Sequence, residues 1–140
     1  MNPDKKDQKT LALWAADCAE HVLGLFEATC KKDDRPWEAI EAGRAWAHGL
    51  ITCSEARAAA SEAHAAARET ERPAACAAAR AAGHAAATAH AVGHARHAAS
   101  YAINAVKYAA HRNEVDRLTG EEREWQMKQL PEHLRSAMFH

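Results

Sequence analysis

The sequence predicts an all-α protein, a compact alanine-rich bundle of five to seven helices joined by short loops. Of its 140 residues, 37 are alanine, and nearly every second residue between Ala56 and Ala110 is alanine. Alanine has the highest intrinsic helix propensity, because it loses no side-chain rotamer entropy when a helix forms. No segment shows the alternation of β-branched and polar residues that is typical of a strand. Small side chains also let neighbouring helices approach closely.

The length fits one domain. Residues 1–9 are polar and are expected to form a disordered tail, which leaves residues 10–140 as a single all-helical domain. Each buried alanine contributes well under the ~1.5–3 kcal/mol of a buried leucine or phenylalanine. Stability is therefore expected to come from helix propensity, close packing, assembly into a homo-oligomer and a few large anchors. These anchors are Trp14, Phe26, Trp37, Ile40, Trp46, Tyr101, Ile103, Tyr108 and Trp125.

The first two helices are predicted from apolar spacing and from proline and glycine. Apolar residues recur at helical spacing over residues 10–28, which predicts the first helix. The second begins at Pro36, because proline is favoured in the first helical turn, and it ends before Gly49, because glycine is typical of helix C-termini. Within it, the small Gly43 stands between bulky residues and indicates a close helix crossing.

The later helices are predicted mainly from their N-termini. Two sequences have the form of a capping box, Thr52–Glu55 and Thr119–Glu122, and each is expected to open a helix. Pro73 opens another, and Gly93 marks its end or a kink. The expected helices cover residues 53–70, 73–93, 94–118 and 119–130, with a short last helix from residue 131.

Composition excludes several function classes. The net charge is −1 with neutral histidines, which argues against a dedicated nucleic-acid binder. No apolar run approaches the ~18 residues of a membrane span, and the polar start has no leader segment, so a cytoplasmic protein is expected. The four cysteines form no CxxC pair, and free thiols are expected in a reducing compartment.

The histidines suggest a metal site as one alternative. His90, His94 and His97 are spaced so that an unbroken helix would place them on one face, where they could bind a divalent transition metal such as zinc. A break at Gly93 would separate the first of them from the others. No acidic residue occurs in residues 72–113, so a carboxylate ligand would have to come from elsewhere. The other interpretation is that these histidines are exposed or hydrogen-bonded at the edges of alanine-rich helices.

Three stripes of polar and aromatic residues repeat at helical spacing. If the helices over residues 53–70 and 73–93 are antiparallel neighbours, their stripes would frame an Arg/His-lined groove that suits an anionic ligand or an acidic partner. The stripe on the next helix has the mixed chemistry of a recognition surface, or of a semi-buried packing face. The stripes are Arg57, Ser61, His64 and Arg68; Cys76, Arg80, His84 and Thr88; and His97, Tyr101, Asn104, Tyr108 and His111.

Several sequence segments resemble an immunity protein family of bacterial polymorphic toxin systems. The most specific are RPWEAIEAGRAWAHG, residues 35–49, and AGHAAATAH, residues 82–90, and their order and spacing fit over residues 11–134. The resemblance implies a small all-helical cytosolic protein that binds and neutralises a toxin.

Two functional hypotheses follow. The first is a non-catalytic immunity protein whose partner is a cognate toxin, because no catalytic motif stands out and the stripes suit recognition. The alternative is a protein that binds a metal or a small anionic ligand in a His/Arg/Tyr-lined pocket, and catalysis is left open in that case. Neither hypothesis involves nucleic acid or a membrane. The expected contact residues are Arg57, His64, Arg80, His84, His97, Tyr101 and Tyr108.

Overall fold

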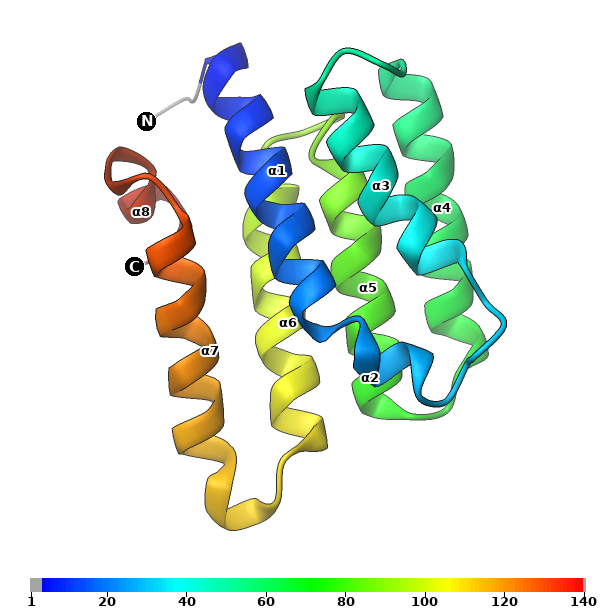
Figure 1. Cartoon of the computed structure of the whole chain (residues 1–140), viewed down its shortest axis with the longest axis vertical. Helices are drawn as coiled ribbons and strands as arrows, with labels where there is room; N and C mark the ends of the chain where they lie inside the picture. The colour runs from blue at the N-terminus through cyan, green and yellow to red at the C-terminus, as the bar shows by residue number, and fades with distance from the viewer. Residues whose placement is uncertain (1–3, 140) are drawn as a thin grey trace.

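The computed structural model describes residues 4–139, and these residues form helices and turns with no strand among them (Figure 1). The predicted all-α class is confirmed. None of the helices in this described part is long and apolar enough to cross a membrane. The helices are α1 (Lys5–Val22), α2 (Gly24–Glu27), α3 (Arg35–Ala47), α4 (Cys53–Glu69), α5 (Pro73–Ala87), α6 (His94–Ala109), α7 (Val115–Gln129) and α8 (Glu132–Met138), with a 3-10 turn at Arg112–Glu114.

Helix α5 lies at the centre of the bundle, where it packs against α1, α2, α3, α4 and α6 (Figure 1). Its sequence, PAACAAARAAGHAAA, is apolar on almost every side, as expected for a helix surrounded by others. Ten of its 15 residues are buried, and all ten are alanine or glycine. Its interior contacts are therefore made by methyl groups and backbone.

The close crossing expected at Gly43 is confirmed. A Cβ atom at this position would lie 3.1 Å from the carbonyl oxygen of Ala85 and 3.6 Å from the Cα of Ala86. Helix α3 therefore passes over α5 with glycine against backbone, and a side chain at this position would force the two helices apart.

Helix ends follow the local sequence in several places. Gly49 lies just beyond the C-terminus of α3 at φ +75°, in the left-handed region that glycine adopts without strain. The amide of Gly49 donates to the carbonyl of Trp46, and that of Leu50 donates to Ala45, which is the Schellman pattern. The capping box at Thr52–Glu55 forms as predicted, and α4 follows it.

The N-terminal helix is longer than expected. Helix α1 begins at Lys5 rather than near Thr10, because the Asp4 side chain accepts a hydrogen bond from the amide of Asp7 and caps the helix. The start of the expected tail, residues 1–3, lies outside the described residues. The predicted single helix over residues 10–28 is also divided, since α1 ends at Val22 and the short α2 follows.

The predicted boundary at Thr119 is wrong. Helix α6 ends at Ala109 and α7 begins at Val115, so Thr119 lies inside α7 and opens no helix. Its hydroxyl donates to the carbonyl of Val115, 2.7 Å away, which is the bond a mid-helix threonine makes to the preceding turn. The chain turns instead at Ala110 and His111, whose backbones are extended.

Most of the large buried side chains come from α1, α2, α7 and α8. The Trp14 indole donates to the backbone carbonyl of Gln126 at 2.8 Å, and its ring meets Phe139 edge-on at 5.8 Å between centroids. These contacts attach α7 and Phe139 to α1. The largest fully buried apolar side chains here are Leu11, Phe26, Leu130 and Leu134.

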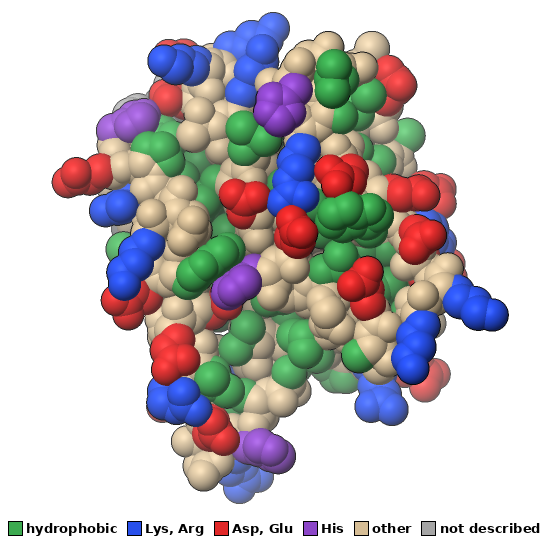
Figure 2. All heavy atoms as spheres, in the orientation of Figure 1, with side chains coloured by type: hydrophobic (Ala, Val, Ile, Leu, Met, Phe, Trp, Pro, Cys, Tyr) green, Lys and Arg blue, Asp and Glu red, His purple; other side chains and the backbone are tan. Residues whose placement is uncertain are grey.

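The face formed by α1, α3 and α7 carries most of the visible carboxylates (Figure 2). Arg44 lies between α1 and α3, pairs with Asp17 at 2.9 Å and also pairs with Glu20 and Glu41. Histidine side chains are scattered singly over this face (Figure 2). The molecule is therefore polarised, because residues 72–113, which include α5 and α6, contain no Asp or Glu.

Candidate functional site

Four histidines from three helices meet where α4, α5 and α6 lie together. We call His64, His84, His94 and His97 the histidine cluster. The ring of His84 is at its centre, with centroid distances of 4.9 Å to His64, 5.0 Å to His94 and 5.3 Å to His97. The Tyr101 ring stacks on His84 at 5.2 Å with an interplanar angle of 9°. The cluster therefore extends along α6 into a tyrosine face.

Arg80 fixes the protonation of one member of the cluster. Its guanidinium nitrogen Nη1 lies 3.2 Å from Nδ1 of His64. A guanidinium has no acceptor, so Nδ1 of His64 must accept this hydrogen bond and must carry no proton. The His64 ring is therefore neutral in this arrangement, with its proton on Nε2.

A second hydrogen bond links two further members. Nδ1 of His84 lies 2.8 Å from Nδ1 of His94. One ring must donate and the other must accept, so the two imidazoles cannot both be cations while this bond is present.

The surroundings of the cluster favour neutral histidines. Burial, followed by the charge of Arg80, lowers the pKa of His64. Burial, followed by the proximity of His64, lowers the pKa of His84 to about 3. The pKa of His94 is also lowered, first by burial and then by His97. Among residues 4–139, no Asp or Glu is recorded as opposing these effects, and Arg80 and Arg68 supply positive charge beside His64.

Gly83 provides the space for the His64 ring. A Cβ atom at residue 83 would lie 2.6–2.9 Å from three atoms of that imidazole, which is closer than real contacts allow. Glycine inside a helix costs about 1 kcal/mol relative to alanine. The local sequence Gly83-His84 therefore sacrifices helix propensity so that the histidines of α4 and α5 can meet.

A groove adjoins the cluster between α5 and α6. It has a volume of about 360 Å³, and we call it the tyrosine groove. Arg80 and Tyr101 stand at the end next to the histidine cluster, and Tyr108, which is 55% exposed, stands near Pro73 at the other end. Its lining residues are Pro73, Cys76, Ala77, Arg80, Tyr101, Asn104 and Tyr108.

The structure brings most of the predicted contact residues together. His64, Arg80, His84, His97, Tyr101 and Tyr108 all belong to the cluster or the groove. The α4 and α5 stripes meet directly at His64 and Arg80, and the groove described above lies between α5 and α6.

Some stripe members lie apart from this site. Arg57 is exposed and contacts neither the cluster nor the groove. His111 lies beyond the end of α6, and Thr88 is fully buried. His94 and Gly83 were missing from the predicted contact residues, and the Gly-His pair in an alanine-rich helix was the only sequence clue to the latter.

The metal alternative finds no preformed site. His90 lies in the turn before α6, with its ring 6.3 Å from His94, while His94 and His97 are 6.1 Å apart. Among residues 4–139, no three His, Cys, Asp or Glu side chains are arranged to hold a metal ion. Binding of zinc at His90, His94 and His97 therefore stays a prediction.

The buried Cys18 is a poor candidate for a thiol nucleophile. All four cysteines are free thiols, and burial raises the pKa of Cys18 far above its usual range. A thiol that holds its proton so strongly is a packing group rather than a nucleophile.

A protein-family model described as "Imm-5 like putative immunity protein" matches residues 1–133. The match covers the whole histidine cluster and the tyrosine groove. No curated protein and no solved structure matches the chain.

Proposed function

The chain belongs to the Imm-5 like immunity protein family, and on that premise we propose that it binds a bacterial toxin and neutralises it by protein–protein contact. The family match over residues 1–133 is the observation that carries this proposal. Neutralisation by contact needs a rigid surface, and it does not need a catalytic group. Helices α4 to α6 supply such a surface, because their methyl and backbone packing holds the outward-facing side chains in place.

We place the contact surface on the histidine cluster and the tyrosine groove. Tyrosine and arginine are the residue types enriched at the energetic centres of protein interfaces. Tyr108 is a large ring that is 55% exposed, and the Tyr101 ring is held by its stack on His84. A preformed surface of this kind loses little side-chain entropy on binding.

Growth rescue tests the proposal. Candidate toxins encoded beside this gene are expressed with and without the protein, and the wild-type chain is expected to restore growth. Calorimetry with the purified pair is expected to give a complex of fixed stoichiometry. Tyr108→Ala should weaken binding by about 1–3 kcal/mol, as for an aromatic hot spot. Arg96→Gln, an exposed change elsewhere on α6, should not. If no encoded toxin is bound or neutralised, the proposal fails.

A second candidate function is binding of a small anionic ligand, which the contact of Arg80 with the histidine cluster favours, or of a metal, for which no preformed site is found among residues 4–139. Elemental analysis of tag-free protein tests the metal form. A stoichiometric metal that is lost in a His90→Ala/His94→Ala variant would support it. If the protein contains no metal and chelators leave its melting temperature unchanged, the metal-binding hypothesis is rejected.

A further inference from the structure

We infer that the tyrosine groove receives an aspartate or glutamate side chain of the partner, with the carboxylate on Arg80 and a neighbouring apolar residue against the rings of Tyr101 and Tyr108. This inference deepens the proposed function and rests on it for the identity of the partner. It depends on three observations: the unpaired charge of Arg80, the apolar walls of the groove, and the absence of acidic residues around it.

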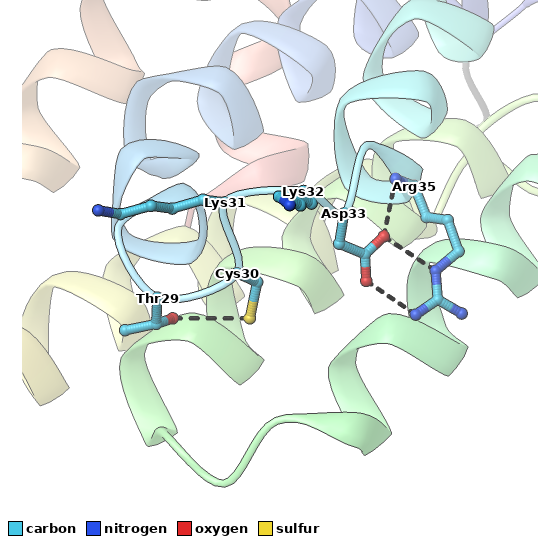
Figure 3. Close-up of a pocket in the computed structure, with 6 residues that line it drawn as sticks. All are labelled: Thr29, Cys30, Lys31, Lys32, Asp33 and Arg35. Atoms are coloured by element: carbon cyan, nitrogen blue, oxygen red, sulfur yellow. Dashed lines mark hydrogen bonds and ion pairs between the residues drawn. The ribbon is translucent and has the colours of Figure 1, made fainter.

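Arg80 differs from the other half-buried arginines that carry ion pairs. Arg35 pairs with Asp33 at 2.8 Å and with Glu69 at 2.9 Å. Figure 3 shows the pair with Asp33, in the pocket beside the loop that precedes α3. Arg44 pairs with three carboxylates. Arg80 instead donates to a neutral imidazole, and no other hydrogen bond or ion pair is recorded for it among residues 4–139.

A partly desolvated guanidinium without a counter-ion is a strong site for a carboxylate. Its planar fork can donate two parallel hydrogen bonds, which makes the pair stronger than a neutral hydrogen bond. The bond to His64 uses Nη1 and orients the fork, so the remaining N–H groups stay available.

The walls of the groove define the rest of the occupant. Pro73, Cys76 and Ala77 line the α5 side, and the two tyrosines and Asn104 line the α6 side. This lining is mostly apolar, with one cation at one end. It therefore fits an amphipathic segment that offers one carboxylate and one aliphatic or aromatic side chain.

Charge distribution favours a protein carboxylate over a nucleic-acid phosphate. The groove offers one guanidinium, whereas tight binding of a nucleic-acid backbone needs several cations that neutralise successive phosphates. A single acidic side chain on a partner of mixed charge does not need several cations.

Two peptides that differ only in charge test this directly. Acetyl-Gly-Phe-Glu-Gly-amide and acetyl-Gly-Phe-Gln-Gly-amide are titrated into the full chain, with the tyrosine ring and arginine Nε resonances followed by NMR. The Glu peptide is expected to bind about tenfold more tightly than its twin and to shift Tyr101, Tyr108 and Arg80. Arg80→Gln should abolish the preference, Arg80→Lys should keep part of it, and the matched control Arg96→Gln should keep all of it. Circular dichroism checks that each variant folds.

Three outcomes would overturn the inference: equal or absent binding of the two peptides, a preference that survives Arg80→Gln, or stronger binding of a single-stranded oligouridylate in the same groove. Toxin binding separates this inference from the proposed function. If wild type and Arg80→Gln neutralise a toxin equally, this inference is rejected and the proposed function stands. A Glu preference without any neutralised toxin sinks the proposed function and leaves the carboxylate site in place.

Discussion

Two sides of the bundle are held together in different ways. Around α5, helices meet through alanine and glycine, as at Gly43, where the backbone of α5 is almost in contact with α3. Helices α1, α2, α7 and α8 instead contribute large buried side chains to the core, such as Phe26 and Leu134. The comparison teaches that the packing around α5 depends on small side chains, whereas the packing of the other helices depends on large ones. Opposite substitutions should therefore damage the two sides.

The largest effect is expected on the side with large residues. Phe26 is fully buried, so Phe26→Ala removes a whole ring and leaves a cavity. The free energy of unfolding should fall by about 3–5 kcal/mol, measured by chemical denaturation. Trp37→Ala, at a ring that is 36% exposed, is the matched control and should cost far less. A loss below 1 kcal/mol for Phe26→Ala would contradict the comparison.

Added volume should harm the alanine side instead. Ala82 is fully buried in α5, and Ala82→Leu inserts three carbon atoms where helices already touch. A loss of about 1–3 kcal/mol is expected, again by denaturation. The same change at the exposed Ala58 of α4 should stay within about 0.5 kcal/mol. Equal tolerance at the two positions would mean that α5 is not closely packed.

Acid should weaken the alanine side through its histidines. The pKa of His84 is about 3 in the folded chain and about 6.5 in the unfolded chain, so the unfolded state binds more protons below pH 6.5. Stability is thus present above pH 6.5 and is lost as the pH falls from 6.5 towards 3. Discounted for partial exposure, the loss attributable to His84 between pH 6.5 and 4.5 is about 1–2 kcal/mol. The free energy of unfolding is measured against pH for wild type and for His84→Gln, and the difference between the two profiles gives the contribution of His84. Identical profiles would refute this prediction.

The smallest effect compares two glycines inside helices. Gly120→Ala in α7 meets nothing within 4 Å and should stabilise the protein by about 1 kcal/mol. Gly83→Ala has the same propensity gain, but its methyl group must displace the His64 ring from Arg80. It should stabilise less or not at all, and it should move the His64 imidazole resonances. An equal gain at both positions with unchanged resonances would show that Gly83 makes no room for His64.

Helix starts were predictable where the sequence contains a local cap or proline. Pro36, Thr52 and Pro73 each mark a real helix N-terminus, because their effect depends on neighbouring backbone alone. Thr119 has the same pattern as Thr52 yet lies inside α7, since its hydroxyl is satisfied by the preceding turn. A capping sequence therefore predicts a helix start only where the residues before it are not themselves helical.

The site was predictable in its residue types but not in its location. Helical spacing placed Tyr101, Asn104 and Tyr108 on one face, and all three line the groove. Spacing within one helix says nothing about which neighbour that face meets, so the groove between α5 and α6 was not predicted. Nothing in the pattern separated Arg80, which contacts His64, from Arg57, which contacts none of the site.

The alanine packing of α5 also has a thermal consequence. The heat capacity change of unfolding rises with the apolar area exposed and falls with the polar area exposed, by about +0.45 and −0.26 cal/mol/K per Å². A core of methyl groups and backbone amides exposes little apolar area and much polar area when it unfolds. Its stability curve is therefore expected to be flatter than that of a leucine-packed bundle of equal length, with the loss of stability spread over a wider range of temperature.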